Sequence, residues 1–433
     1  MTTATARPRL RRGLITIAGV LSVGALALTG CAGGGAGTPE SLTFLKNAEN
    51  TTTEPVLDAL AADQCATEQK TLPLDVSSVP QADLDAQVQL LASQGGLPAV
   101  FSAGGNPAEG AKLVEQGVVL DFDKALTDLG VRDQIVPGAV STIEKLYGGG
   151  FNFLPFQYNI EGIFYNKALF AENGWEEPQT WTELTDLAGE VQAAGVTPFA
   201  ASGEQGWPLT RLLSGYIFRD LGPDALQKVA DGDAKLTDPE YVAAAQAIAD
   251  LGDSGYFGEN VTSLDYDAAT NEFLTGKAAM IYMGSWLLGN INGDDNQIGA
   301  ENVGFMPFPA VEGGAGDIGQ YPANVGLPAT FSSKSYTDDV GSWLKCIANN
   351  YGNAALEQGQ ITGFVADVEV DQNEVTAAVA DTIATSTDSV LWFEALFPAK
   401  ASSVSSTNAA LLVTGQLAPG DFMKLVQDAI DNP

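Results

Sequence analysis

Residues 41–65 read SLTFLKNAENTTTEPVLDALAADQC, and this stretch decides the fold class. Residues 41–45 alternate between the two faces of a short β-strand. Thr-Glu-Pro at residues 53–55 then has the composition of a helix start, with proline in the first turn, and the helix is expected to run to about Cys65. A strand followed directly by a helix is the first half of a βαβ unit.

The same alternation continues for another 36 residues. We expect a strand at residues 71–76, a helix at 83–93 that ends at Gly95-Gly96, and a strand at 98–101. Strand, helix, strand, helix, strand is the order of a doubly wound α/β lobe. The fold class is therefore predicted to be α/β.

Later segments repeat both element types up to about residue 333, and the remainder has mainly helical patterns. A capping box, Thr180-Trp181-Thr182-Glu183, marks one helix start. The expected strands cover residues 151–156, 162–165, 197–200 and 278–283, and the expected helices cover 180–195, 238–250 and 267–274.

Length, charge and composition exclude several classes of function. A chain of 433 residues with 45% hydrophobic content is more often two lobes than one. The balance of 54 acidic against 20 basic residues gives a net charge of −34, which repels phosphate backbones, so we expect no nucleic-acid partner. The sequence contains no histidine, which removes Ser-His-Asp catalysis and histidine metal sites, and we expect neither a cofactor nor a metal.

The amino terminus has the order of an export signal. Residues 7–12 contain four arginines, residues 14–28 are apolar, and small residues follow. An apolar run of 15 residues is shorter than the roughly 20 that a transmembrane helix needs. We therefore expect residues 1–30 to be a signal peptide.

Leu28-Thr29-Gly30-Cys31 resembles the lipobox of bacterial lipoproteins, in which the cysteine becomes the first residue and carries the lipid. We expect lipid attachment at Cys31, a flexible tether over residues 31–40, and a location on the outer face of the cytoplasmic membrane. The alternative is a plain secretory signal with a chance cysteine. The other cysteines, Cys65 and Cys346, either form a disulfide or remain two buried free thiols.

A series of short motifs follows residue 147: FLPF at 153–156, GIFYNKALF at 162–170, EPQTWTEL at 177–184, GVTPF at 195–199, FLTGKAAM at 273–280, GSW at 284–286 and GFMPFP at 304–309. In this series the chain resembles the extracellular solute-binding proteins that serve carbohydrate ABC importers. The series of motifs, rather than any one motif, makes the resemblance specific, although residues 322–326 lack a glycine pair that many members carry.

The resemblance implies a two-lobed, periplasmic-binding-protein-like fold of type II, with discontinuous lobes joined by a hinge. Residues 41–157 plus 325–368 would form lobe 1, and residues 158–324 plus 369–433 would form lobe 2. It also implies a monomer that captures a mono- or oligosaccharide between the lobes and delivers it to the permease subunits of an ABC transporter.

A sugar presents apolar C–H faces and a rim of hydroxyls, so its site needs aromatic rings and accurately placed polar groups. The aromatic candidates are Tyr158, Trp207, Trp286 and Trp392, whereas Trp181 and Trp343 lie in helical patterns and are expected in the core. The polar candidates are Glu49, Asn50, Ser102, Asn159, Ser285 and Asn324.

Two alternatives stay open. The same fold could bind a non-sugar solute such as a polyamine, a metal chelate or a peptide. A lipid-anchored glycoside hydrolase with two catalytic carboxylates would need no histidine, and 54 acidic residues do not exclude such a pair. No motif marks one, and the resemblance favours a binding protein that is not an enzyme.

Overall fold

The computed structural model describes residues 40–48, 50, 52–102, 107–385 and 389–433. The predicted signal peptide, Cys31 and all but the last residue of the predicted tether lie outside these residues. Among the helices that are described, none has the length and apolar character needed to cross a membrane.

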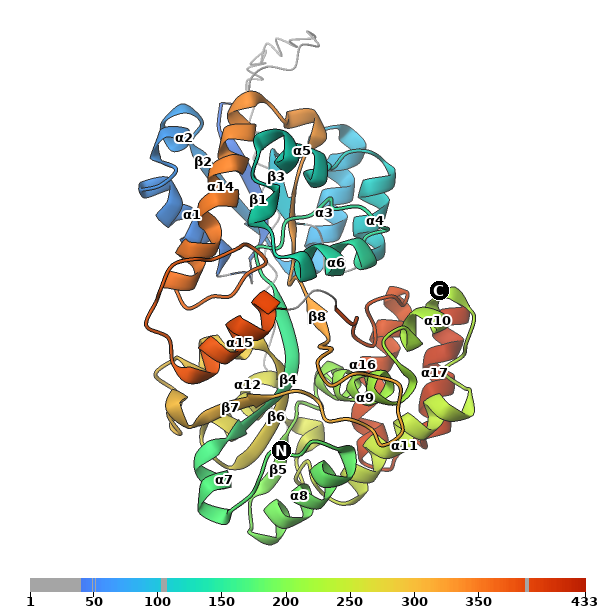
Figure 1. Ribbon diagram of the computed structural model, residues 1–433. Helices are drawn as coiled ribbons and strands as arrows, with labels where there is room; N and C mark the ends of the chain where they lie inside the picture. The colour runs from blue at the N-terminus through green and yellow to red at the C-terminus, as the bar shows by residue number, and fades with distance from the viewer. Residues whose placement is uncertain (1–39, 49, 51, 103–106, 386–388) are drawn as a thin grey trace, which may run out of the picture. The chain divides into compact units, whose positions relative to one another are not determined.

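The described strands form two separate sheets (Figure 1). In the first sheet, the central strand β1 pairs in parallel with β2 and β3, and β9 pairs antiparallel with β3. The spatial order is β2-β1-β3-β9. These strands span Leu42–Asn47 (β1), Leu74–Val79 (β2), Val100–Ser102 (β3) and Ala329–Phe331 (β9).

The second sheet is built around β4, whose eight residues are all buried. Strand β4 pairs antiparallel with β6, β7 and the short β8, and β5 pairs in parallel with β6. The strands span Asn159–Asn166 (β4), Thr197–Ala200 (β5), Ala278–Gly284 (β6), Val303–Met306 (β7) and Ala323–Asn324 (β8).

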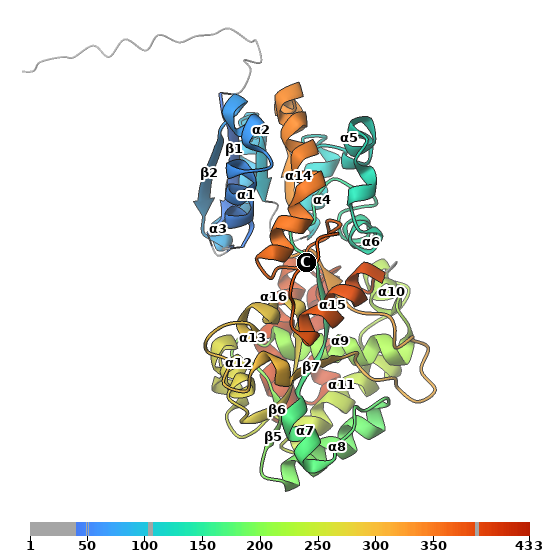
Figure 2. The same ribbon diagram turned by 60° about the vertical axis from the view of Figure 1, so that its left-hand side comes forward.

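The helices form two groups, one near each sheet (Figures 1 and 2). Near the first sheet lie α1 (Thr53–Ala62), α2 (Ala66–Thr71), α3 (Gln81–Gln94), α4 (Pro107–Glu115), α5 (Phe122–Leu129), α6 (Pro137–Leu146) and α14 (Asp338–Glu357). Near the second lie α7 (Lys167–Asn173), α8 (Trp181–Ala193), α9 (Trp207–Leu221), α10 (Ala225–Asp231), α11 (Pro239–Asp253), α12 (Tyr266–Leu274), α13 (Leu288–Ile291), α15 (Glu374–Thr385), α16 (Ala399–Val413) and α17 (Pro419–Asp431).

The α/β fold class is confirmed, and the local signals explain much of it. The capping box at Thr180 and Glu183 forms with both of its hydrogen bonds and starts α8. Gly95 ends α3 with φ of +65°, a left-handed conformation that favours glycine. The residue boundaries of the two lobes stay a prediction.

Two expected strands differ in the structure. Residues 151–156 form no strand, and only Leu154 makes an isolated bridge, with Ala329. Pro155 lacks the N–H that a strand ladder needs. The side chains of Phe153 and Phe156 are buried in the core, although neither residue belongs to a strand. The strand expected at 71–76 begins three residues later, at Leu74.

Cys65 and Cys346 form a disulfide, so the structure contains the first of the two alternatives left open by the sequence. The bond joins the segment between α1 and α2 to α14, which packs against both helices. Trp343 on the same helix is fully buried, as expected, and its indole N–H donates to the carbonyl of Leu72 at 2.8 Å.

Candidate ligand-binding site

A cavity of about 750 Å³ collects side chains from distant parts of the chain. Asn47 ends β1 and Trp286 follows β6, so two strand carboxyl ends face it, the usual place for ligands in α/β proteins. The lining residues are Asn47, Asn50, Gln157, Trp207, Arg211, Tyr266, Trp286, Asn324, Gly326, Leu327 and Trp392.

Three aromatic rings form one continuous part of this lining. The ring of Trp207, at the start of α9, lies 5.9 Å from that of Trp286 and 6.0 Å from that of Tyr266, measured between centroids. Gly284 permits this arrangement because a Cβ at that position would overlap the indole of Trp286. Half-buried rings held in this way offer apolar faces to a ligand.

Arg211 lies beside this aromatic group. It follows Trp207 by four residues on α9, so both side chains leave the same face of the helix. The guanidinium carbon lies 4.7 Å from the ring centroid of Trp392 and 5.5 Å from that of Trp207, within the range of cation–π contacts. Arg211 therefore links Trp392 to the other rings.

Two buried carboxylates form ion pairs with Arg211 and hold its side chain in place. Glu161 of β4 pairs with Nη1 of Arg211, and Oε2 of Glu394 lies 3.4 Å from Nε. The side chains of Glu161 and Glu394 are only 1% and 8% exposed. Burial raises the pKa of Glu161 and the charge of Glu394 raises it further, while Arg211 opposes both effects.

A network of amides and a hydroxyl connects β4 to β8 and to the segment after β6. Nδ2 of Asn159 donates to Oδ1 of Asn324 at 3.3 Å, and the hydroxyl of Ser285 donates to Oδ1 of Asn159 at 3.2 Å. Nδ2 of Asn324 also donates to Oε1 of Glu161 at 3.4 Å. The network fixes the position of Asn324, which is the member that lines the cavity.

The opposite part of the lining comes from the loop after β1. Oδ1 of Asn50 accepts from the backbone N–H groups of Thr52 and Thr53, and its Nδ2 donates to the hydroxyl of Thr53. Nε2 of Gln157 donates to the hydroxyl of Thr52 at 2.9 Å. Asn50 therefore stabilises its own loop, Gln157 joins that loop to the segment before β4, and both residues line the cavity.

The structure brings half of the predicted ligand-binding residues together: Asn50, Trp207, Trp286, Asn324 and Trp392. Asn159 and Ser285 lie behind the lining, buried in the network described above. Glu49 lies outside the described residues. Whether any of these side chains contacts a ligand stays a prediction.

Two predicted residues lie away from the cavity lining. Tyr158 is fully buried in the core, because side chains alternate along the extended chain and its neighbour Gln157 is the one that faces the cavity. Ser102 is 1% exposed, because it pairs with Ala329 of β9, a strand the sequence pattern did not predict.

Several lining residues were missed by the sequence reasoning. Gln157 was not among the predicted ligand-binding residues, although it lies at the predicted boundary of lobe 1. Arg211 could have been found, since its i+4 spacing from Trp207 places both on one helix face. Asn47, Tyr266, Gly326 and Leu327 carried no comparable signal, because their positions depend on how distant segments pack.

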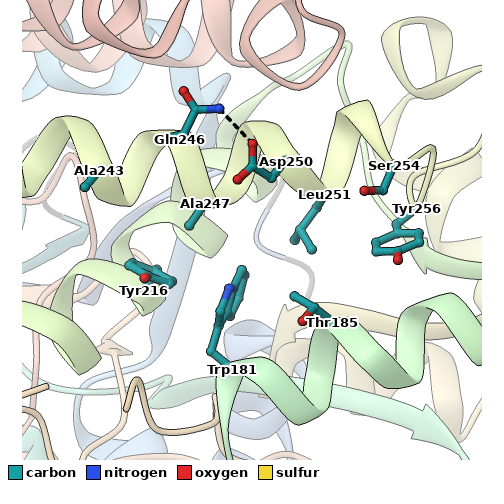
Figure 3. Close-up of a pocket in the computed structure, with 10 residues that line it drawn as sticks. All are labelled: Trp181, Thr185, Tyr216, Ala243, Gln246, Ala247, Asp250, Leu251, Ser254 and Tyr256. Atoms are coloured by element: carbon teal, nitrogen blue, oxygen red, sulfur yellow. Dashed lines mark hydrogen bonds between the residues drawn. The ribbon is translucent and has the colours of Figure 1, made fainter. Parts of the chain in front are cut away.

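A second hollow of about 520 Å³ lies among α8, α9 and α11 (Figure 3). Trp181 and Tyr216 point into it, but the Trp181 ring already stacks on Phe308, with centroids 5.6 Å apart. Nε2 of Gln246 donates to Asp250 at 2.7 Å, so these polar groups satisfy one another. This hollow contains none of the predicted ligand-binding residues and is the weaker candidate. Nowhere among the described residues do three metal-ligating side chains gather.

Comparisons with known proteins agree with a binding function. The chain is 30% identical over 172 residues to the multiple sugar-binding protein of Streptococcus mutans, covering 38% of this chain and 39% of the relative. It is 25% identical over 281 residues to a xylose/arabinose-binding protein of Haloferax volcanii, covering 63% and 58%. The chain thus spans less than two thirds of the length of both relatives.

Solved structures and a family model complete the comparison. The structure of a chitin oligosaccharide binding protein superposes with a TM-score of 0.75 at 25% identity, covering 91% of this chain and 99% of that protein. The model of the bacterial extracellular solute-binding proteins matches residues 50–354, which is more than half of the sequence. The chain therefore belongs to the family of bacterial extracellular solute-binding proteins.

Proposed function

We propose that this protein is the extracytoplasmic substrate-binding component of an ABC-type sugar importer. The observation that carries the proposal is the cavity lining, which contains the rings of Trp207, Tyr266, Trp286 and Trp392 and the fixed guanidinium of Arg211, which lies against Trp207 and Trp392. Aromatic faces match the C–H faces of a sugar, and the guanidinium and amides match its hydroxyls. The relatives named for sugar binding support the same ligand class.

A neutral sugar suits the cavity better than an anion does. Two buried acidic side chains, Glu161 and Glu394, stand against the one guanidinium of Arg211, so the site has no excess positive charge for an anion, and the whole chain carries −34. An anionic ligand would meet this field at close range. The family membership supports a binding protein rather than a glycoside hydrolase.

A thermal-shift screen with a panel of neutral sugars tests the proposal, because a ligand that binds only the folded state raises the melting temperature. We expect one or more sugars to raise it and to be recovered uncleaved by chromatography. A shift given only by polyamines or peptides would favour the non-sugar alternative, and release of shorter sugars would favour the hydrolase.

We further propose that a lipid on Cys31 holds the protein at the outer face of the cytoplasmic membrane, where a monomer delivers its sugar to the permease. Support comes from the lipobox-like sequence at residues 28–31. Replacing Cys31 with serine should release the protein from membranes or leave the signal uncleaved. Normal processing with unchanged membrane retention would contradict the anchor.

We also propose that ligand capture closes the two predicted lobes about the segments that connect them, near the point where Asn159 of β4 pairs with Asn324 of β8. A sugar that contacts both lobes stabilises the closed form by its difference in affinity for the two forms. Saturating sugar should then reduce the radius of gyration in solution scattering. Superimposable curves with and without a bound sugar would favour a rigid pocket.

A further inference from the structure

A smaller cavity, which is distinct from the hollow around Trp181 and is called the second cavity below, adjoins the candidate site beside Trp392. It has a volume of about 270 Å³, and Arg211 and Trp392 line both cavities. The boundary between the two is therefore built from one guanidinium and one indole ring. The lining of the second cavity consists of Pro107, Arg211, Trp392, Glu394, Ala395, Phe397, Ala399, Ser402 and Ser406.

Arg211 is fixed at this boundary before any ligand arrives. Its Nη1 and Nε face Glu161 and Glu394, both buried, and its guanidinium lies over Trp392. Among the described residues no hydrogen bond uses Nη2 of Arg211. A guanidinium carries five N–H donors, so the Nη2 donors remain for a ligand at the point where the two cavities meet.

The base of the second cavity is also a fixed part of the fold. Ser402 and Ser406 stand one turn apart on α16 and are half-buried. The backbone of Ser406 contacts Gly206, whose φ of +69° and lack of a Cβ allow α16 to approach the start of α9. Because α9 carries Trp207 and Arg211, this contact holds the second cavity and the main one in one arrangement.

The sizes of the cavities indicate how a ligand would divide between them. The smaller volume lies just below the range of about 300–1,000 Å³ that small-ligand sites occupy, and the larger volume lies in the upper half of that range. One sugar ring suits the smaller cavity. More than one ring suits the larger cavity.

We infer that the ligand is an oligosaccharide that runs past Arg211 and Trp392, with its terminal unit over α16 and the preceding units in the main cavity. This inference rests on the proposed sugar-binding function. Arg211 donates to hydroxyls near the linkage between the two sites, and Ser402 and Ser406 offer hydroxyls to the terminal unit.

Calorimetry with xylo-, malto- and chito-oligosaccharides, from monosaccharide to tetrasaccharide, tests the inference. We expect wild-type affinity to rise by about tenfold or more between the monosaccharide and a longer member of the series that binds. Ser402→Trp fills the second cavity and should abolish most of this gain, so that the longer sugars bind the variant no more tightly than the shorter members that the main cavity alone can hold. Ser403→Trp, on the exposed side of the same helix, is the matched control and should keep the gain.

Ser406→Leu provides a second obstruction in the same cavity if Ser402→Trp lowers the melting temperature. Equal wild-type affinities for short and long members would overturn the inference, as would a full gain in both obstructing variants. Binding of the monosaccharide alone would overturn the inference and leave the proposed function intact. No binding by any of these sugars would count against both.

Discussion

The two sides of the main cavity differ in how their side chains are used. We define the aromatic side as Trp207, Tyr266, Trp286, Trp392 and Arg211, and the amide side as Asn47, Asn50 and Gln157. The aromatic side is held in place by neighbouring rings and by buried carboxylates behind Arg211. On the amide side, Asn50 already bonds within the loop after β1, and Gln157 already bonds to Thr52 of that loop.

This difference suggests separate roles, in which the aromatic side recognises the ligand and the amide side supports the fold around it. A ring face that is half-buried before binding loses little conformational freedom when a sugar stacks on it. An amide that must leave its present partners to bind a ligand exchanges one hydrogen bond for another, with a small net gain. We therefore expect most of the binding free energy to come from the aromatic side.

The largest expected effect is on stability, from removing the buried cation of the aromatic side. Arg211→Ala leaves Glu161 and Glu394 buried without a counter-charge, and we expect a loss of about 3–5 kcal/mol in the free energy of unfolding. Lys46→Ala is the matched change beside the amide side. Its partner Glu54 is 39% exposed and can be solvated, so the loss in the free energy of unfolding should be about 1 kcal/mol. Denaturant unfolding measures both, and equal losses would remove the contrast.

Affinity should depend strongly on the rings of the aromatic side. Trp207→Ala and Trp286→Ala should each weaken sugar binding by about tenfold to a hundredfold, since a stacked indole contributes about 1.5–3 kcal/mol. Trp181→Ala is the matched control, because Trp181 lies in the other hollow. A lower melting temperature with unchanged affinity would instead identify Trp207 and Trp286 as core residues.

The amide side should show the opposite balance. Asn50→Ala removes the acceptor for the N–H groups of Thr52 and Thr53 at the start of α1, which should cost about 1 kcal/mol of stability. Sugar affinity should change by less than about threefold, because the side chain is already engaged. An affinity loss as large as that of the tryptophan variants, without a stability loss, would show that Asn50 binds the ligand directly.

The smallest expected effect is a pH dependence that belongs to the aromatic side. Burial raises the pKa of Glu161, so the folded state keeps this proton at pH values where the unfolded chain, with a pKa of about 4.3, has lost it. Stability should therefore fall as pH rises through this window, and Glu161→Gln should remove that contribution.

Unfolding free energies of the wild type and Glu161→Gln, measured from about pH 4.5 to about pH 7, give the difference as a function of pH. The wild type should lose stability relative to the variant as pH rises. A difference that grows in favour of the wild type would mean that Arg211 outweighs burial and lowers the pKa of Glu161.

Local patterns in the sequence were sufficient for the fold class and for part of the site. Strand–helix alternation and the Thr180 capping box depend on neighbours in the chain, and the need of a sugar site for aromatic rings was enough to select Trp207 and Trp286, which lie at the start of α9 and just after β6. The false strand at residues 151–156 arose because aromatic residues packed in the core give the same pattern as a strand.

The rest of the site depends on contacts between distant segments. Glu394 meets Arg211 although it lies 183 positions later in the chain, and Ser102 is covered by β9, which lies more than 200 residues later. Asn159 and Ser285 were chosen as ligand contacts, yet they bond to each other because β4 and β6 are neighbours in the sheet. No pattern within a window of sequence carries this information.

The most direct test is amide hydrogen exchange with and without a saturating sugar. We predict new protection in the peptides around Trp207 to Arg211 and around Trp286, where the rings and the guanidinium hold the ligand, with weaker protection around Asn47 to Thr53. Protection confined to the hollow around Trp181 and Gln246, or a sugar that binds without protecting the aromatic side, would contradict the account.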